Sequence, residues 1–118
     1  MNPEIKTKWL DALRSGKYTQ GRGRLKSVSP GGATAHCCLG VLCEIAAAEG
    51  ITIETDHGTF DNEDSYLPAS VQQWAGVDRG PMVKNDSGDV GFREVMLDRL
   101  NDSGVGFDRI ADLIETSL

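Results

Sequence analysis

The sequence predicts an α+β fold: a small single domain, mostly helical, with four to five helices and one or two short hairpins or strands formed by glycine-rich loops. Apolar residues recur at helical spacing in several stretches, and glycines and prolines cluster between them. The length of 118 residues is typical of one domain. With 39% hydrophobic and 25% charged residues, we expect one globular unit over residues 1–118.

The first helix is predicted between Asn2 and Gly16. Asn2 is a favoured capping residue, and Pro3 suits the first turn because its missing N–H has no partner there. The apolar side chains that recur every fourth residue are Ile5, Trp9 and Leu13. One face of this helix is therefore expected in the core, and Gly16 ends the pattern.

Three stretches of different character follow. Residues 17–34, KYTQGRGRLKSVSPGGAT, contain four glycines and a proline, which indicates a basic loop flanked by short extended pieces. Residues 38–50, CLGVLCEIAAAEG, are apolar over a broad face and indicate a buried second helix. Residues 51–55, ITIET, alternate apolar and polar side chains and favour a strand.

The middle of the chain is rich in turn residues. Within LPASVQQWAGV, a short helix is predicted to begin at Pro68 and to end at Gly76. The next stretch, DRGPMVKNDSGDVG, indicates a hairpin or an irregular excursion. Its expected turn residues are Asn85, Asp86 and Gly88.

The last part of the chain predicts two helices. The first is indicated by the spacing of Phe92, Val95, Met96 and Leu100. The second follows from the apolar stripe of residues 107–118, the clearest 3.6-residue repeat in the sequence. We do not expect a DNA-binding helix-turn-helix, because this last helix carries three acidic residues and one arginine. The pair is interpreted as an αα corner that closes the core.

The chain carries no sign of a membrane segment or a secretion signal. No apolar run approaches the roughly 20 residues that cross a bilayer, and the N-terminal segment is amphipathic and charged. The three cysteines, Cys37, Cys38 and Cys43, lie in one short segment, so they form no long-range pairing framework and are expected to be reduced. These features predict a cytoplasmic protein that does not contact a membrane.

Charge is unevenly distributed along the chain. Residues 1–26 hold seven basic and two acidic side chains and carry +5, whereas the rest carries −11, for a net charge of −6. Two explanations fit: the basic part neutralises the acidic part within the fold, or it receives a small anionic ligand. DNA is not expected as a partner, because the acidic body would repel a long polyanion.

The loop sequence QGRGRLK is a candidate anion site. Its glycines let a ligand approach the backbone, and Arg22, Arg24 and Lys26 offer cations to phosphate oxygens. It has neither the GxxxxGK[ST] nor the GxGxxG spacing, so it indicates generic anion binding, and a solvated basic loop is the alternative. Tyr18 is a candidate for stacking on a base, and Gln20 is a further candidate ligand contact.

The stretch HCCLGVLC has two functional interpretations besides core packing. If the second helix begins here, His36 and Cys38 lie at its positive end and border the anion site. Alternatively, Cys38 is a nucleophile, with His57 and Asn62 completing a papain-like order and Gln20 donating to an oxyanion. The local papain signature is missing, and a cysteine in an apolar helix is commonly a small core residue.

Metal binding is not expected. A structural zinc site usually combines two pairs of cysteine or histidine ligands spaced two to four residues apart. Here Cys37 and Cys38 are adjacent and would point about 100° apart on a helix, and Cys43 follows five residues after Cys38. Few of these atoms can converge, so we predict neither a metal nor another cofactor.

Four motifs follow one another along nearly the whole chain: KWLDALRSGKYTQGRGRL, HCCLGVLCEIA, LPASVQQWAG, and LNDSG followed by FDRIADLIE. Their order resembles a widespread group of small accessory proteins of tailed bacteriophages and prophages. The most specific parts of this resemblance are Gln20 with Gly21, the run 38–43, and Asn101 with Phe107, Ile110 and Ala111. It implies phage origin and the cytoplasm of a host bacterium, but no reaction.

These observations predict a phage-encoded, non-enzymatic protein that binds a small anionic nucleotide and withholds it from a host defence effector. The prediction rests on the charge asymmetry, on the glycine–arginine loop and on an analogy with small phage proteins that sequester nucleotide messengers. Two alternatives stay open: a cysteine-dependent hydrolase of a small substrate, and a protein that inhibits a host enzyme through its acidic surface. Assembly into a homo-oligomer also stays open.

Overall fold

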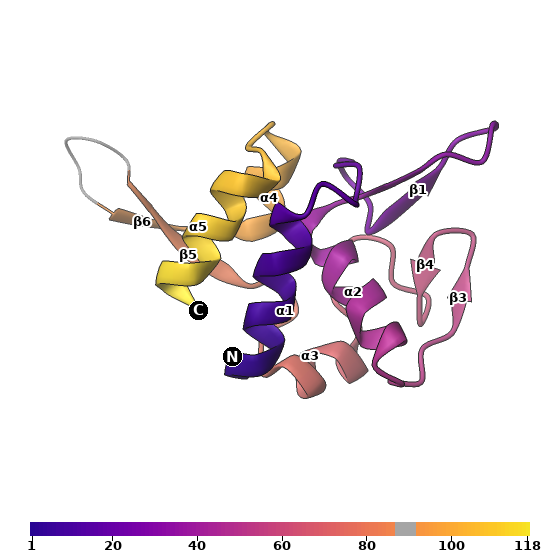
Figure 1. The fold of residues 1–118 in the computed structure, drawn as a ribbon, viewed down its shortest axis with the longest axis horizontal. Helices are drawn as coiled ribbons and strands as arrows, with labels where there is room; N and C mark the ends of the chain where they lie inside the picture. Colours follow the sequence, from indigo (N-terminus) through magenta and orange to yellow (C-terminus); the bar gives the residue numbers. More distant parts are fainter. Residues whose placement is uncertain (87–91) are drawn as a thin grey trace.

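Figure 1 shows the computed structural model, which describes residues 1–86 and 92–118. Within these ranges the chain forms five helices and three two-stranded antiparallel hairpins, which confirms the predicted α+β fold. In chain order the elements are α1 (Pro3–Arg14), β1 (Lys26–Val28), β2 (Thr34–His36), α2 (Cys38–Ala48), β3 (Thr55–Asp56), β4 (Thr59–Phe60), α3 (Ala69–Ala75), β5 (Met82–Asp86), β6 (Phe92–Met96), α4 (Leu97–Asp102) and α5 (Phe107–Ser117). The described residues form three hairpins, whereas the sequence predicts one or two hairpins or strands.

The helices form the centre of the molecule, and the hairpins extend from it. α1 packs against both α5 and α2, while α3 packs against α2 and α4 against both α2 and α5. In Figure 1, hairpin β5–β6 projects toward one end of the long axis, and hairpins β1–β2 and β3–β4 lie toward the other. Because each sheet has only two strands, the core is built by the helices.

The first helix begins as predicted and anchors the second. Asn2 Oδ1 accepts hydrogen bonds from the amides of Glu4 and Ile5 at 2.9 and 3.2 Å. The buried face of α1 consists of Ile5, Trp9, Leu10 and Leu13. Trp9, which is fully buried, donates from its indole Nε1 to the carbonyl of Cys38 at 2.9 Å. This bond fixes α1 against the first turn of α2.

The second helix is enclosed by the rest of the chain. Seven of its 11 residues are buried, which confirms that this stretch is a buried helix. Gly40 lies directly under the loop that precedes β1: a Cβ placed on Gly40 would come within 1.7 Å of the carbonyl oxygen of Leu25. The loop can cross the first turn of α2 only because this position has no side chain.

One predicted helix is partly wrong. Phe92, Val95 and Met96 belong to strand β6, and helix α4 begins only at Leu97. β6 pairs antiparallel with β5, with Val83 opposite Val95. Pairing with a neighbouring strand therefore outweighs the helical spacing of the apolar residues, which is a local signal only.

Two further predictions change in detail. Of residues 51–55, only Thr55 lies in a strand, whereas Ile51 and Ile53 precede that strand and pack against the core. Asn85 and Asp86 lie within β5 rather than in a turn, and Gly88 lies outside the described residues.

The C-terminal helices form the expected corner. α4 and α5 pack against each other across a turn in which Gly104 has φ +103°, a backbone conformation that favours glycine. Along the parts of the chain that the structure describes, no helix is long and apolar enough to cross a membrane.

Candidate functional site

The loop between α1 and β1 is fastened to the fold at alternate residues. The amides of residues 21, 23 and 25 each donate a hydrogen bond to a different element. These bonds are Gly21 to the carbonyl of His36 (2.7 Å), Gly23 to Asp102 Oδ1 (2.8 Å) and Leu25 to the carbonyl of Asp64 (2.6 Å). The two positions between them, Arg22 and Arg24, are exposed. The loop therefore presents two arginines from a backbone that is held in place.

A buried polar network lies beneath this loop, with Asn101 at its centre. The side chain of Asn101 is fully buried, and every polar atom of its amide is used. Its Oδ1 accepts from Gln20 Nε2 (2.9 Å) and the Cys38 amide (3.2 Å), and its Nδ2 donates to the Gly21 carbonyl (2.8 Å) and Asp102 Oδ1 (3.1 Å). One side chain thus joins the loop, the start of α2 and the end of α4.

Gln20 extends this network to the start of α5. Its Nε2 donates to the carbonyl of Val105 at 2.7 Å, and its Oε1 accepts from the amide of Phe107 at 3.1 Å. Both amide hydrogens of Gln20 are therefore used within the fold. The position of Gln20 next to the basic loop reflects this structural role, and its donors are not free for an oxyanion or a phosphate.

The basic residues of the N-terminal quarter fall into two groups. One group pairs with carboxylates of the acidic body: Lys8 with Glu49, Arg14 with Asp112 and Glu115, and Lys26 with Glu44. This confirms neutralisation within the fold for that group. The other group, Lys6, Lys17, Arg22 and Arg24, makes no ion pair with any residue in ranges 1–86 and 92–118. Lys6 instead donates to the carbonyl of Glu115 at 2.9 Å, and the other three cations lie on the loop.

Lys26 and His36 share one carboxylate on the inner side of the loop. His36 Nε2 lies 3.1 Å from Glu44 Oε2, and Lys26 Nζ lies 3.6 Å from the same oxygen. The hydrogen bond with His36 lowers the pKa of Glu44, and the Lys26 charge acts in the same direction against the desolvation of the carboxylate. Tyr18 meets the His36 ring edge-on, with centroids 5.3 Å apart. Lys26 and His36 are therefore occupied by the fold.

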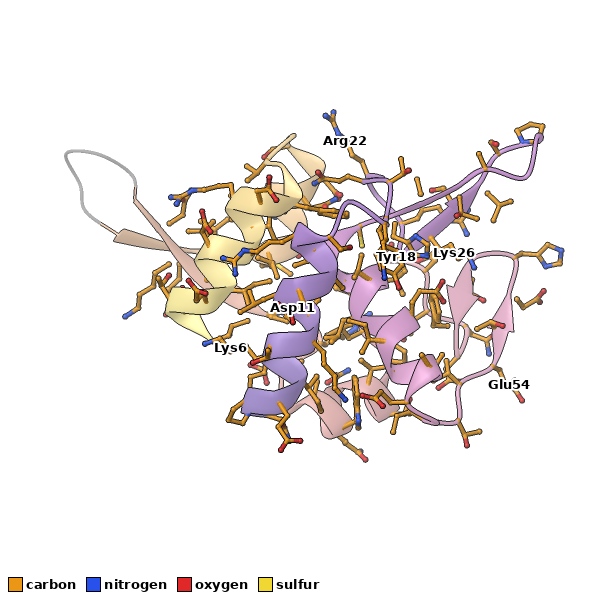
Figure 2. All side chains as sticks on the ribbon, in the orientation of Figure 1. Lys6, Asp11, Tyr18, Arg22, Lys26 and Glu54 are labelled. Carbon is orange, nitrogen blue, oxygen red and sulfur yellow. The ribbon has the colours of Figure 1, made fainter. Side chains whose placement is uncertain are left out.

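A hollow of about 360 Å³ opens between the end of α1 and the start of α5. Its lining includes Arg14, Tyr18, Gln20, Gly106, Phe107 and Asp108. Arg14 is held by Asp112 at 2.9 Å and by Glu115 at 3.3 Å. In the turn that leads into α5, two residues before Gly106, a Cβ placed on Gly104 would lie 3.3 Å from a guanidinium nitrogen of Arg22. Figure 2 shows Arg22 pointing outward from the loop, away from Lys26.

Two other hollows lie beside the hairpins. One, of about 210 Å³, lies between β1 and hairpin β3–β4, and its lysine, Lys26, is already paired with Glu44. The other, of about 320 Å³, lies beside β5, and no basic side chain lines it. Each has an exposed apolar residue in its lining, Val28 in the first and Met82 in the second. Neither hollow brings an unpaired cation to an aromatic ring.

The cysteines, which include the candidate nucleophile Cys38, lie in the core. All three thiols are buried. Burial raises the pKa of Cys37 to about 11 and raises that of Cys38 well above its usual value, whereas a thiol nucleophile needs a lowered pKa and access to substrate. His57 is exposed in the turn of hairpin β3–β4, where it pairs with Asp56, and Asn62 is exposed as well. The candidate nucleophile Cys38 is thus fully buried, whereas His57 and Asn62 lie at the surface.

The structure also corrects part of the predicted ligand site. Cys38 has no exposed surface, and its amide is already bonded to Asn101, so the start of α2 is closed to an anion. His36 is buried as well. Of the seven predicted ligand residues, Arg22 and Arg24 are exposed on the loop and Tyr18 lines the hollow.

Sequence reasoning missed the residues that complete this region. Phe107 and Arg14 reach the hollow from helices that are far from the loop in sequence, and Asn101 organises the loop from α4. Asn101 and Phe107 both fall within the specific motifs of the sequence, but nothing in a single chain shows that they meet Gln20. Their contact depends on tertiary structure.

Among the residues that the structure describes, no group of three or more histidine, cysteine, aspartate or glutamate side chains could hold a metal ion. Asp98 Oδ1 is buried without a hydrogen-bond partner in the described part of the chain, and burial raises the pKa of this carboxyl.

The fold and the site together define a small α+β domain that presents an anchored cationic loop next to an aromatic hollow. Residues 1–118 match the family model described as Domain of unknown function (DUF8296), and the chain belongs to this family. No curated protein and no solved structure matched the chain.

Proposed function

We propose that this protein binds a small anionic ligand of the nucleotide type, without catalysis, through Arg22 and Arg24. The observation that carries the proposal is that the amides of residues 21, 23 and 25 hold the loop by hydrogen bonds. The two arginines between them are exposed and make no ion pair within the described chain. Guanidinium groups bind phosphate oxygens bidentately, and a backbone that is already ordered loses little entropy on binding.

The backbone between the two arginines supports the same proposal. Gly23 has φ +76°, and a Cβ placed on it would meet no atom within 4 Å. A ligand can therefore approach the main chain between Arg22 and Arg24 without steric conflict. An extended polyanion is disfavoured, because the chain carries a net charge of −6.

The biological setting is part of the proposal. The resemblance to small accessory proteins of tailed phages supports a phage-encoded protein that acts in the host cytoplasm. In that setting, binding without turnover withholds a nucleotide signal from a host defence effector, which is counter-defence by sequestration. The burial of Cys38 favours binding over hydrolysis.

The experiment incubates the purified protein with a panel of cyclic and ADP-ribose-type nucleotides, removes unbound ligand, denatures the protein by heat and analyses the released molecules by mass spectrometry. We expect one nucleotide to be recovered unchanged from the native protein and to be lost from Arg22→Gln/Arg24→Gln. The control, Arg79→Gln/Lys84→Gln, removes the same charge from exposed positions elsewhere and retains the ligand.

Two results contradict the proposal. Recovery of a chemically altered nucleotide indicates an enzyme, and recovery of no nucleotide favours the alternative of an inhibitor that contacts a host protein. Light scattering with and without the recovered ligand measures whether binding occurs in a monomer or in a homo-oligomer.

A further inference from the structure

We propose that the hollow between α1 and α5 receives the aromatic base of the ligand whose phosphates are bound by Arg22. This inference rests on the proposed function, and it adds a second subsite formed by Tyr18, Phe107 and Gly106. It identifies the ligand class as a nucleotide rather than an inorganic or sugar phosphate.

The lining of the hollow suits an aromatic ring. Tyr18 and Phe107 supply aromatic rings to its lining, and stacking on such rings is a common way to hold a base. Gly16 and Gly106 line it as well, and a Cβ placed on either would meet no atom within 4 Å. The volume of about 360 Å³ falls at the lower end of small-molecule sites.

The charges around the hollow determine which end of a nucleotide can enter it. Arg14 is already paired with Asp112 and Glu115, and Asp108 adds a carboxylate to the lining. A phosphate inside would therefore meet more negative than unpaired positive charge, whereas an uncharged base would not be repelled. A carboxylate such as Asp108 can also accept a hydrogen bond from an exocyclic amino group.

Arg22, which makes no ion pair within residues 1–86 and 92–118, lies beside the turn that leads into the hollow. The guanidinium of Arg22 is beside Gly104, and two residues later Gly106 lines the hollow. Gly104 and Gly106 are at most about 7 Å apart, so the guanidinium beside Gly104 and the Gly106 end of the hollow are separated by a distance on the order of one nucleotide. A nucleotide whose phosphates contact Arg22 can therefore place its base in the hollow.

The buried network keeps the two subsites together. Gln20 bonds to Asn101 on the loop side and to the amide of Phe107 on the hollow side. The distance between the loop and the start of α5 is thus set by one amide whose hydrogens are both engaged within the fold. Gln20 acts here as a positioning residue rather than as a ligand contact.

The test compares ADP with inorganic pyrophosphate by calorimetry, since both contain two phosphates and only ADP contains adenosine. We expect ADP to bind roughly tenfold to a hundredfold more tightly, the ratio that one stacked base contributes. In spectra of the complex, adenine protons should show nuclear Overhauser effects to the rings of Tyr18 and Phe107.

Two variants separate the subsites. Gly106→Asn places a side chain at the mouth of the hollow, and the variant is expected to fold because Gly106 is the N-cap of α5, where asparagine is favoured. It should lower ADP affinity about tenfold and leave pyrophosphate unchanged, whereas Arg22→Gln should weaken both. Gly31→Asn, in open space on another turn, is the control and should change neither.

The outcomes distinguish the two proposals. Equal affinity for ADP and pyrophosphate, with both weakened by Arg22→Gln, overturns the base subsite and leaves the cationic loop in place. Binding of neither probe overturns both proposals. Tighter binding of ADP that Gly106→Asn does not alter also refutes the base subsite, because the base then lies elsewhere.

Discussion

Replacing Asn101 with leucine tests whether the buried network holds the loop. Leucine has a similar size and makes no hydrogen bonds. The amide of Cys38 and the carbonyl of Gly21 each lose the partner that Asn101 provides, and Gln20 loses one acceptor. An unsatisfied buried group costs about 1–3 kcal/mol, so the expected loss in the free energy of unfolding is roughly 3–5 kcal/mol. That is a large part of the roughly 5–15 kcal/mol that stabilises a typical domain.

The assay is urea denaturation followed by tryptophan fluorescence, with Trp9 as a buried reporter that contacts the same turn of α2. Gln73→Leu removes an amide from an exposed position on α3 and is expected to change stability by less than about 0.5 kcal/mol. A loss below about 1.5 kcal/mol for Asn101→Leu would refute the view that these hydrogen bonds organise the fold.

Asn101→Asp refines the same test through pH. The introduced carboxyl keeps an acceptor toward Cys38 but loses the donor toward Gly21, and its charge is buried. Burial raises the folded-state pKa of this carboxyl above its unfolded value. The destabilisation is therefore greatest at neutral pH and decreases as pH falls from the folded-state pKa to the unfolded one. A loss that did not change with pH would contradict burial of this side chain.

Three further predictions follow from individual contacts. The three thiols should not react with a maleimide at pH 8 in the native state and should react only on unfolding, because they are buried and the pKa of Cys37 is raised to about 11; rapid labelling of the native protein would refute this. Gly40→Ala should destabilise the domain by more than about 2 kcal/mol, since its Cβ would lie 1.7 Å from the Leu25 carbonyl oxygen, whereas Gly31→Ala should have little effect in thermal unfolding. Glu44→Gln should cost most stability above pH 4.5, because His36 lowers the pKa of Glu44 in the folded state. This contribution is lost as pH falls through the lowered pKa. Unfolding measured from pH 3 to 7 should therefore show a difference from wild type that decreases in acid.

Local patterns in the sequence were sufficient to predict most helices. Asn2 and Pro3 mark the start of α1, Gly76 ends α3, and the apolar stripe of α5 needs no tertiary information. These signals are contained within a few consecutive residues, so they can be read from one chain. The short strands β1 and β2 were expected for the same reason, as extended pieces on either side of a glycine-rich turn.

The prediction failed where the structure depends on residues that are far apart. Residues 92–96 have helical spacing, but they form a strand because β5 provides a partner. The candidate ligand site was changed in the same way, since the amide of Cys38 would be free at the start of an isolated helix and is occupied here by Asn101. A single sequence does not reveal that α4 supplies a cap for α2.

The most specific residues of the sequence motifs have structural roles rather than roles in binding. Gln20, Gly21, Cys38 and Asn101 all meet in one buried network, so each is required for the position of the loop. The residues that the loop presents, Arg22 and Arg24, take no part in that network and can change without altering the fold. Under the proposed function, a related chain can keep this framework and bind another ligand by exchanging the two exposed positions. In this chain, changes at Asn101 should lower both stability and ligand binding, whereas changes at Arg22 and Arg24 should lower binding alone.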